Sequence, residues 1–142
     1  MVPLARARLV EPPDVAAVDA LRGAAAAEVR SLRGGAQYPR WQPPAPGDPA
    51  RPLWVGELAG AVVGYLSASR TGATGTIDAL FVDPGCRAVG VGAALLDAAL
   101  AWMAAEGCTD VDAYALPGAR HTKNFFEEAG LTARLLVVHR RL

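Results

Sequence analysis

The 142-residue sequence has little cysteine, no net charge and no long apolar run. Its two cysteines, Cys86 and Cys108, are too few for a metal cluster, and no Cys/His spacing completes a zinc site, so we expect no metal. The 14 basic and 14 acidic side chains cancel, which argues against general binding to nucleic acid or to an anionic membrane. No apolar run could span a bilayer and no signal-like segment develops, so we expect a cytoplasmic protein.

The composition is that of a folded globular protein, with 52% hydrophobic and 20% charged residues. A chain of this length can bury one sizeable core, so we expect a single domain over residues 1–142.

Apolar periodicity and turn residues predict an α/β protein of mixed type. A helix starting at Asp14 should be interrupted at Gly23 and resume over 24–32, because glycine weakens a helix interior. Strand 76–82, helix 91–106 and strand 110–116 should form a parallel βαβ unit. The remaining expected elements are strands at 4–10, 53–58, 61–69 and 131–142 and a short helix at 119–129.

Residues 33–52 contain six prolines and three glycines, which excludes a helix or a central strand. Long loops in compact domains are often functional, and this one carries Tyr38 and Trp41. We interpret the loop as a lid or wall of a binding site. Tyr38, Trp41 and the nearby Trp54 either line the pocket of that site or fasten the loop to the core.

The most informative stretch joins a strand to a helix through glycines. A β-branched and aromatic run ends at Val82, a turn follows at Pro84, and Gly90 and Gly92 open an Ala/Leu-rich helix. A helix start offers unpaired N–H groups and the positive end of its dipole, which predicts an anion site, most plausibly for a diphosphate. The alternative is that the two glycines only allow close packing of helix and sheet.

Two segments resemble the GCN5-related N-acetyltransferase (GNAT) superfamily. Its signature of Arg or Gln, two variable residues, Gly, one variable residue and Gly or Ala is matched by Arg87-Ala88-Val89-Gly90-Val91-Gly92. A later family block, Phe-Tyr-Glu closing on Gly-Phe, is echoed by Phe125-Phe126-Glu127-Glu128-Ala129-Gly130-Leu131. The expected order of elements also resembles the family over nearly the whole chain.

This resemblance implies a central, mostly antiparallel sheet of six to seven strands, with helices on both faces. Acetyl-CoA, the co-substrate, would lie in a V opened between strands 76–82 and 110–116. The backbone of Phe81 and Val82 would bind the pantetheine arm. The pyrophosphate would be held by N–H groups of Arg87, Ala88, Val89, Gly90, Val91, Gly92 and Ala93.

The implied activity is that of an acetyl-CoA-dependent N-acetyltransferase, an acyltransferase that moves acetyl to a primary amine of a small molecule or a protein by direct attack in a ternary complex. Two positions depart from the family pattern, because Ala119 stands where Asn is frequent and Phe126 where a general-acid Tyr is frequent. The alternative is therefore a catalytically impaired acyl-CoA sensor or partner module.

Two residues are candidates for the missing acid–base chemistry. Asp78 shares the side-chain parity of Leu80 and Val82, and a buried carboxylate there could act as the base, unless it pairs with an arginine or lies exposed. Tyr114 is our first substitute for the general acid, with simple packing on the sheet as its alternative. His121 is a second substitute, or a partly exposed helix residue.

The run from Leu135 to Val138 is apolar at every position. It favours either a homodimer interface or a buried central strand.

Overall fold

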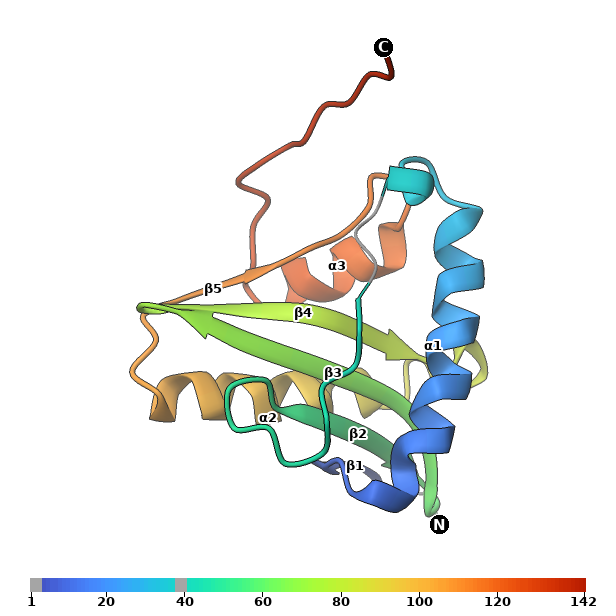
Figure 1. Cartoon of the computed structure of the whole chain (residues 1–142), viewed down its shortest axis with the longest axis vertical. Coiled ribbons are helices and arrows are strands. Elements are labelled where there is room, and N and C mark those ends of the chain that lie inside the picture. The colour runs from blue at the N-terminus through green and yellow to red at the C-terminus, as the bar shows by residue number, and fades with distance from the viewer. Residues whose placement is uncertain (1–3, 38–40) are drawn as a thin grey trace.

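The computed structural model describes residues 4–37 and 41–142 (Figure 1). Within these ranges it contains three α-helices and five strands, together with 3₁₀ turns at Pro12–Asp14, Gly35–Gln37 and Pro84–Cys86. The elements in chain order are β1 (Ala5–Leu9), α1 (Val15–Arg30), β2 (Leu53–Leu58), β3 (Ala61–Thr71), β4 (Thr74–Val82), α2 (Val91–Ala105), β5 (Asp110–Ala113) and α3 (Arg120–Glu128). None of these helices combines the length and the apolar composition that crossing a membrane requires.

The five strands form one mixed sheet in the order β1-β2-β3-β4-β5. The first three pairings are antiparallel, and β4 pairs with β5 in parallel through α2. The mixed α/β architecture and its parallel βαβ unit are therefore as the sequence predicts, while the sheet has fewer strands than the six to seven expected. The difference lies at residues 131–142, which form no strand because no described strand pairs with them.

Helix α1 is continuous, which corrects the prediction of a break at Gly23. Burial of Val18 and Leu21, at 2% and 9% exposure, fixes the helix on the sheet. A glycine in a helix interior costs about 1 kcal/mol relative to alanine, and burial of two such side chains outweighs that cost.

The helices lie on opposite faces of the sheet. On one face, α1 packs against Val55, Tyr65 and Phe81. On the other face, the apolar side of α2 packs with Phe126 of α3 against Leu66 and other buried side chains. The sheet is thus buried on both sides, and the connection from β4 to α2 carries the chain from the sheet to the α2 face (Figure 1).

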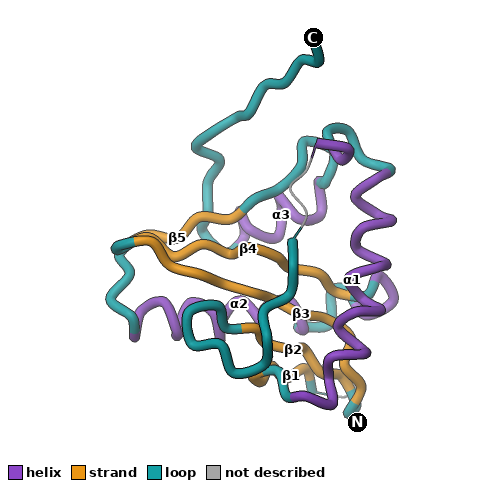
Figure 2. Tube along the Cα trace, viewed as in Figure 1, coloured by secondary structure: helices purple, strands orange, loops and turns teal. Residues whose placement is uncertain are grey.

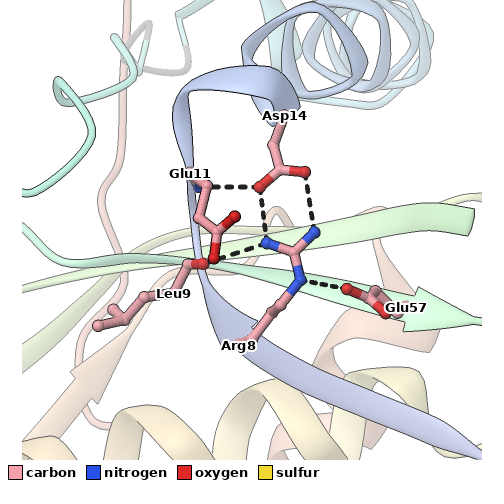
Figure 3. A network of polar contacts seen from close by, with 5 residues as sticks. All are labelled: Arg8, Leu9, Glu11, Asp14 and Glu57. Atoms are coloured by element: carbon pink, nitrogen blue, oxygen red, sulfur yellow. Dashed lines mark hydrogen bonds and ion pairs between the residues drawn. The ribbon is translucent and has the colours of Figure 1, made fainter. Parts of the chain in front are cut away.

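A partly buried ion-pair network fixes the corner between β1 and α1 (Figure 3). Arg8 donates to both carboxylate oxygens of Asp14, at 2.7 and 2.9 Å, and its Nε donates to Glu57 on β2. The backbone N–H of Glu11 donates to Asp14 at 2.8 Å. The Arg8 guanidinium lowers the pKa of Asp14, chiefly through this hydrogen bonding. The network is structural, because these side chains satisfy one another.

Candidate active site

Strands β4 and β5 form a fork. They pair only from Thr74–Asp110 to Ile77–Ala113, after which the chain beyond β5 diverges from β4 (Figure 1). Asp78 and Tyr114 directly follow the last paired residues, so the two catalytic candidates from the sequence stand at the base of the fork. Along residues 78–82, β4 pairs with β3 on one side and with no described strand on the other.

Asp78 is the extra residue of a β-bulge. Ser67 and Ala68 of β3 face Ala79 and Ile77, so Asp78 has no partner of its own in the register. The alternation that was expected to align Asp78 with Leu80 and Val82 is interrupted here: Ile77 packs on the α2 side and Ala79 on the α1 side. Bulges re-aim side chains and are frequent beside active sites.

The Asp78 carboxylate sits in an environment that disfavours its charge. Its Oδ2 is buried and accepts no hydrogen bond from any described residue. Burial raises the pKa of Asp78, while the nearby Ser69 hydroxyl and the positive charge of Arg51 act in the opposite direction. A carboxylate with a raised pKa is a stronger proton acceptor once ionised.

The open edge of β4 offers backbone groups to a ligand. Asp83 donates its N–H to the Val63 carbonyl of β3 at 2.8 Å. Along an antiparallel pair, successive residues direct their backbone N–H and C=O groups alternately toward the neighbouring strand and away from it. Phe81 therefore directs its N–H and C=O toward Tyr65 of β3, whereas Leu80 and Val82 direct theirs toward the open edge. Of the two residues expected to bind the pantetheine arm, only Val82 has its backbone on that side.

The loop before α2 presents a row of free N–H groups. None of the N–H groups of residues 87–93 donates to an acceptor among the described residues, and the first helical bond runs from Ala94 to Gly90 at 3.0 Å. Gly90 has φ 93°, a left-handed conformation that glycine adopts without strain. The row, which includes Ala88, Val89, Val91 and Ala93, is consistent with the predicted anion site.

The two signature glycines have different structural roles. A Cβ on Gly92 would approach the Phe125 ring of α3 to 3.1 Å, so the missing side chain lets α3 pack on the start of α2. A Cβ on Gly90 would lie 3.7 Å from Ala5, which is ordinary contact, so Gly90 is required by its backbone conformation alone. Gly92 thus allows close packing of helix on helix, and not the packing of helix and sheet that the alternative for the glycine pair predicted.

Arg87 is held by three hydrogen bonds. Its Nη atoms donate to the two carboxylate oxygens of Glu28 on α1, at 3.1 and 2.9 Å, and its Nε donates to the Val82 carbonyl at 3.0 Å. The guanidinium carbon lies 5.5 Å from the centre of the Phe81 ring. Arg87, and to a smaller degree His121, lowers the pKa of Glu28. The arginine expected beside the phosphates is therefore already neutralised by a carboxylate.

An aromatic row crosses the α1 face of the sheet. Trp41 stacks on Tyr65 with ring centres 4.9 Å apart, and Tyr65 lies 6.2 Å from Phe81. Figure 2 shows the loop from residue 41 to 52 passing over the sheet, where Trp41 packs against the α1-side core. Trp41 thus fastens the loop to the core, which is one of the two roles expected of it, and the role of the loop as a wall of a binding site stays a prediction. Trp54 instead packs on the opposite face against Trp102, and Tyr38 lies outside the described residues.

The substitutes for a general acid occupy three different environments. Tyr114 is 61% exposed beyond the end of β5. The His121 Nε2 on α3 lies 3.8 Å from a Glu28 carboxylate oxygen. Phe126 is 6% exposed inside the α2-side core, and Ala119, at the start of α3, is buried as well.

Sequence reasoning missed Glu28 and Tyr65, although both contact predicted site elements. Glu28 looks like any polar residue of a helix, and only the packing of α1 across the sheet brings it to Arg87. For Tyr65 the sequence did hold a signal, because the alternation along β3 places its side chain on the same face of the sheet as that of Ser67.

Within the described ranges, no group of three or more His, Cys, Asp or Glu side chains is arranged to hold a metal ion. A shallow hollow between α2 and β5, lined by Met103 and Cys108 among others, lies at the C-terminal end of α2, away from the free N–H groups.

Comparison with solved structures identifies the same fold in acetyltransferases. The Trypanosoma brucei acetyltransferase is 19% identical over 98% of this chain and 100% of that chain, with a TM-score of 0.67. Glucosamine-6-phosphate N-acetyltransferase from Arabidopsis thaliana is 15% identical, with coverages of 97% and 98% and a TM-score of 0.71. The aminoglycoside N-acetyltransferase AAC(6')-Iy, solved in complex with CoA, is 15% identical, with coverages of 100% and 97% and a TM-score of 0.72.

Among curated proteins, no sequence matches this one significantly. The model of the acetyltransferase (GNAT) family matches residues 20–131, which include α1 from Ala20 onward, the whole fork, the loop before α2, and α3. The chain therefore belongs to the acetyltransferase (GNAT) family.

Proposed function

We propose that the protein transfers an acetyl group from acetyl-CoA to a primary amine by direct attack within a ternary complex. The observation that carries this proposal is the row of free N–H groups at residues 87–93, which adjoins the open edge of β4. The family match and the CoA complex of a protein with the same fold support it.

The described residues fit CoA. The N–H groups of residues 87–93, at the positive end of the α2 dipole, would hold the pyrophosphate. The Val82 N–H and both backbone groups of Leu80 would pair with the amides of the pantetheine arm, as an added strand does. The Val82 carbonyl already accepts a hydrogen bond from Arg87. The Arg87 side chain would therefore orient the end of β4 and the loop, and would not bind the phosphates directly.

Asp78 would serve as the base that receives a proton from the incoming ammonium, directly or through a water molecule. Its burial and its unpaired Oδ2 favour proton uptake, and its position at the base of the fork favours access to an amine entering there. Tyr114 follows the last paired residue of the other strand and would protonate the departing thiolate.

The acceptor would enter along the α1 face, between the loop of residues 41–52 and β4. Trp41, which stacks on the buried Tyr65, provides an apolar surface there, and Asp78 would provide a carboxylate that interacts with the charge of Arg51 in this loop. This combination suits a small-molecule amine or a peptide amine with an apolar body. Proteins of this fold whose names specify glucosamine-6-phosphate or aminoglycosides as substrates support an amine acceptor.

Two measurements test the proposal. Calorimetry with CoA and acetyl-CoA should show binding at micromolar to millimolar concentration, and the absence of heat at millimolar CoA would overturn the cofactor assignment. Thiol release against a panel of primary amines should show turnover that depends on Asp78. An Asp78→Asn variant that binds acetyl-CoA normally and turns over at the wild-type rate would remove Asp78 from the mechanism.

One observation favours a second candidate function, a CoA-binding sensor without catalysis. Phe126 carries no hydroxyl and is buried in the core, so it cannot protonate a thiolate. Tight CoA binding without thiol release for any amine, in the wild type and in a Tyr114→Phe variant alike, would support the sensor.

A further inference from the structure

Two oppositely charged side chains, Arg51 and Asp78, flank the same stretch of β3. The carbonyl of Pro52, the residue after Arg51, accepts hydrogen bonds from the Ala68 N–H at 3.2 Å and from the Ser67 hydroxyl at 3.4 Å. On the other side of β3, the bulge places Asp78 opposite Ser67 and Ala68. Only β3 separates Arg51 from Asp78, so their backbones lie about two strand spacings, or roughly 10 Å, apart. A long arginine side chain can bridge much of that distance.

Both side chains belong to the α1 face of the sheet. Alternation along β3 places Ser67 and Ser69 on the same face as Tyr65, which packs in the α1-side core. Burial raises the pKa of Asp78, and the Ser69 hydroxyl and the charge of Arg51 oppose this shift, which places Asp78 on that face as well. Figure 2 shows the loop that carries Arg51 passing over the sheet. The two charges therefore lie over the same part of β3.

The two charges interact without forming an ion pair. Within the described residues, the Arg51 side chain donates one hydrogen bond, from Nη2 to the Gln42 carbonyl at 2.7 Å, and makes no salt bridge to Asp78. Its Nε and Nη1 are left to donate to a ligand, and the buried Oδ2 of Asp78 accepts no hydrogen bond there either. A cation and an anion that are held apart, each with unused hydrogen-bonding atoms, are complementary to a molecule that carries both charges.

An α-amino acid carries this charge pattern on a primary amine. Its ammonium would give a proton to Asp78, and the carboxylate on the adjacent carbon would accept a forked pair of hydrogen bonds from the Arg51 guanidinium. A simple amine would satisfy Asp78 alone. A peptide N-terminus carries an amide in place of the carboxylate, so it would also leave Arg51 without an anion.

Trp41 would contact the side chain of the amino acid. This indole stacks on Tyr65, which precedes Ser67 by two positions and is therefore its neighbour on the same face of β3. Trp41 is itself only half-buried, so part of its surface is open to a ligand. An apolar side chain would lose water-exposed surface by packing on Trp41, which favours its binding.

We propose that the acceptor is a free α-amino acid with an apolar side chain, and that Arg51 determines this specificity by binding its α-carboxylate. The inference rests on the proposed function and leaves the chemistry of that function unchanged. The ammonium gives one proton to Asp78, the α-nitrogen attacks the thioester carbonyl carbon, an N–C bond forms and the C–S bond breaks. Sulfur leaves with the bonding electron pair as the CoA thiolate, which takes up the proton that the acetylated nitrogen releases.

Steady-state kinetics with three matched acceptors test the proposal. These are L-phenylalanine, phenethylamine, which lacks the carboxylate, and L-phenylalaninamide, in which an amide replaces it. The wild type should use phenylalanine about 100-fold more efficiently, in kcat/KM, than either analogue, because only phenylalanine offers an anion to Arg51. Calorimetry with the CoA complex should show the same order of binding, and this second measurement does not require turnover.

Arg51→Gln separates recognition of the carboxylate from support of the loop. It should raise KM for phenylalanine about 30-fold, leave kcat nearly unchanged, and leave both constants for phenethylamine within about two-fold. Arg51→Lys keeps the charge and should recover part of the lost affinity. Arg70→Gln is the matched control, because Arg70 is exposed near the end of β3 and its pair with Glu106 is long, at 3.9 Å, so its loss should change neither substrate.

Two results would each overturn the proposal. The first is that phenethylamine or phenylalaninamide is bound and used as well as phenylalanine. The second is that Arg51→Gln weakens phenylalanine and phenethylamine equally, as loss of the Gln42 contact alone would do. Efficient acetylation of phenethylamine would leave the proposed acetyl transfer standing, since that function requires only a primary amine. Failure to bind CoA would instead overturn the proposed function, and the order of acceptor binding to the protein alone would still decide the role of Arg51.

Discussion

Glu28 on α1 holds Arg87 immediately before α2 through two hydrogen bonds of 3.1 and 2.9 Å. Because Arg87 also donates to the Val82 carbonyl at the end of β4, this pair connects three elements around the candidate active site. The position of the free N–H groups of residues 87–93, before and at the start of α2, therefore depends on α1, which packs on the opposite face of the sheet from α2. Arg87 acts on the loop chiefly by holding it.

Glu28→Gln should lower the free energy of unfolding by about 1 kcal/mol at pH 7 in low salt, because it replaces a charge-assisted pair by a neutral one. The pKa of Glu28 is lowered from its usual 4.5, so the pair contributes above that value and its contribution disappears as the pH falls through the lowered pKa. Urea unfolding of both proteins between pH 7 and pH 3 measures the difference. Glu127→Gln, which breaks an exposed pair with Lys123 on α3, should have a much smaller effect; equal losses would contradict the assigned role.

Asp14→Asn should destabilise the protein by about 2 to 3 kcal/mol, since it leaves the Arg8 guanidinium partly buried with only Glu57 as counter-charge. The pKa of Asp14 is also lowered from 3.8, so this stability is present above that value and is lost on acidification through the lowered pKa. Thermal unfolding monitored at pH 7 tests the size of the effect. Asp19→Asn is the control, because the Asp19–Arg22 pair is exposed and long, at 3.4 Å, and its loss should cost little.

Local patterns in the sequence were sufficient for the joint between β4 and α2. The β-branched run, the Pro84 turn and the glycines specify strand, turn and helix within some twenty consecutive residues, so no distant contact is needed to predict them. The parallel partner β5 follows from the length of the α2 crossover.

The features that sequence reasoning missed depend on contacts between distant segments. Gly23 does not interrupt α1 because burial of Val18 and Leu21 compensates for it. The bulge at Asp78 exists only through the register of β4 against β3, so the alternation counted along β4 alone fails at that residue. The expected strand at residues 131–142 lacks a described partner, and a strand does not form without one.

Ala88→Gly should stabilise the protein by about 1 kcal/mol, because Ala88 has φ 64° and its Cβ is strained in the left-handed region. The same substitution should lower the affinity for CoA several-fold, since a more mobile loop must be ordered on binding. Ala59→Gly is a matched control: Ala59 has φ 52° in the turn between β2 and β3, so it should give the same gain without affecting CoA. Thermal unfolding and calorimetry measure the two effects, and a change in CoA affinity in the Ala59 variant would contradict the local explanation.

Phe126→Tyr should restore the residue type that is frequent in the family at this position without restoring its chemistry. Phe126 is 6% exposed among apolar side chains, so a new hydroxyl would be buried without a partner and should cost about 1 to 3 kcal/mol. Phe125→Tyr, at a half-buried position, should cost less. A stable Phe126→Tyr variant with faster thiol release would mean that this side chain reaches the thiolate after all.

Asp78→Asn should raise the stability of the protein at neutral pH and lower the rate of acetyl transfer. The pKa of Asp78 is raised by burial, so the native state holds its proton more tightly than the unfolded state does, and stability falls as the pH rises from 3.8 through the raised pKa. The neutral amide avoids this loss, so the variant should unfold at a higher temperature than the wild type at pH 7 and at the same temperature below pH 3.8.

The same variant should release thiol roughly 100-fold more slowly at saturating amine, because it has no group to accept the ammonium proton. Asp97→Asn, at an exposed position on α2, should change neither property. If Asp78→Asn were less stable than the wild type at pH 7, its carboxylate would have to be satisfied in the folded protein, and the unpaired Oδ2 would no longer explain a proton-accepting role. A gain in stability coupled to a loss of turnover is the result that a buried base requires, since a residue kept only for packing would improve with the neutral side chain and leave the rate unchanged.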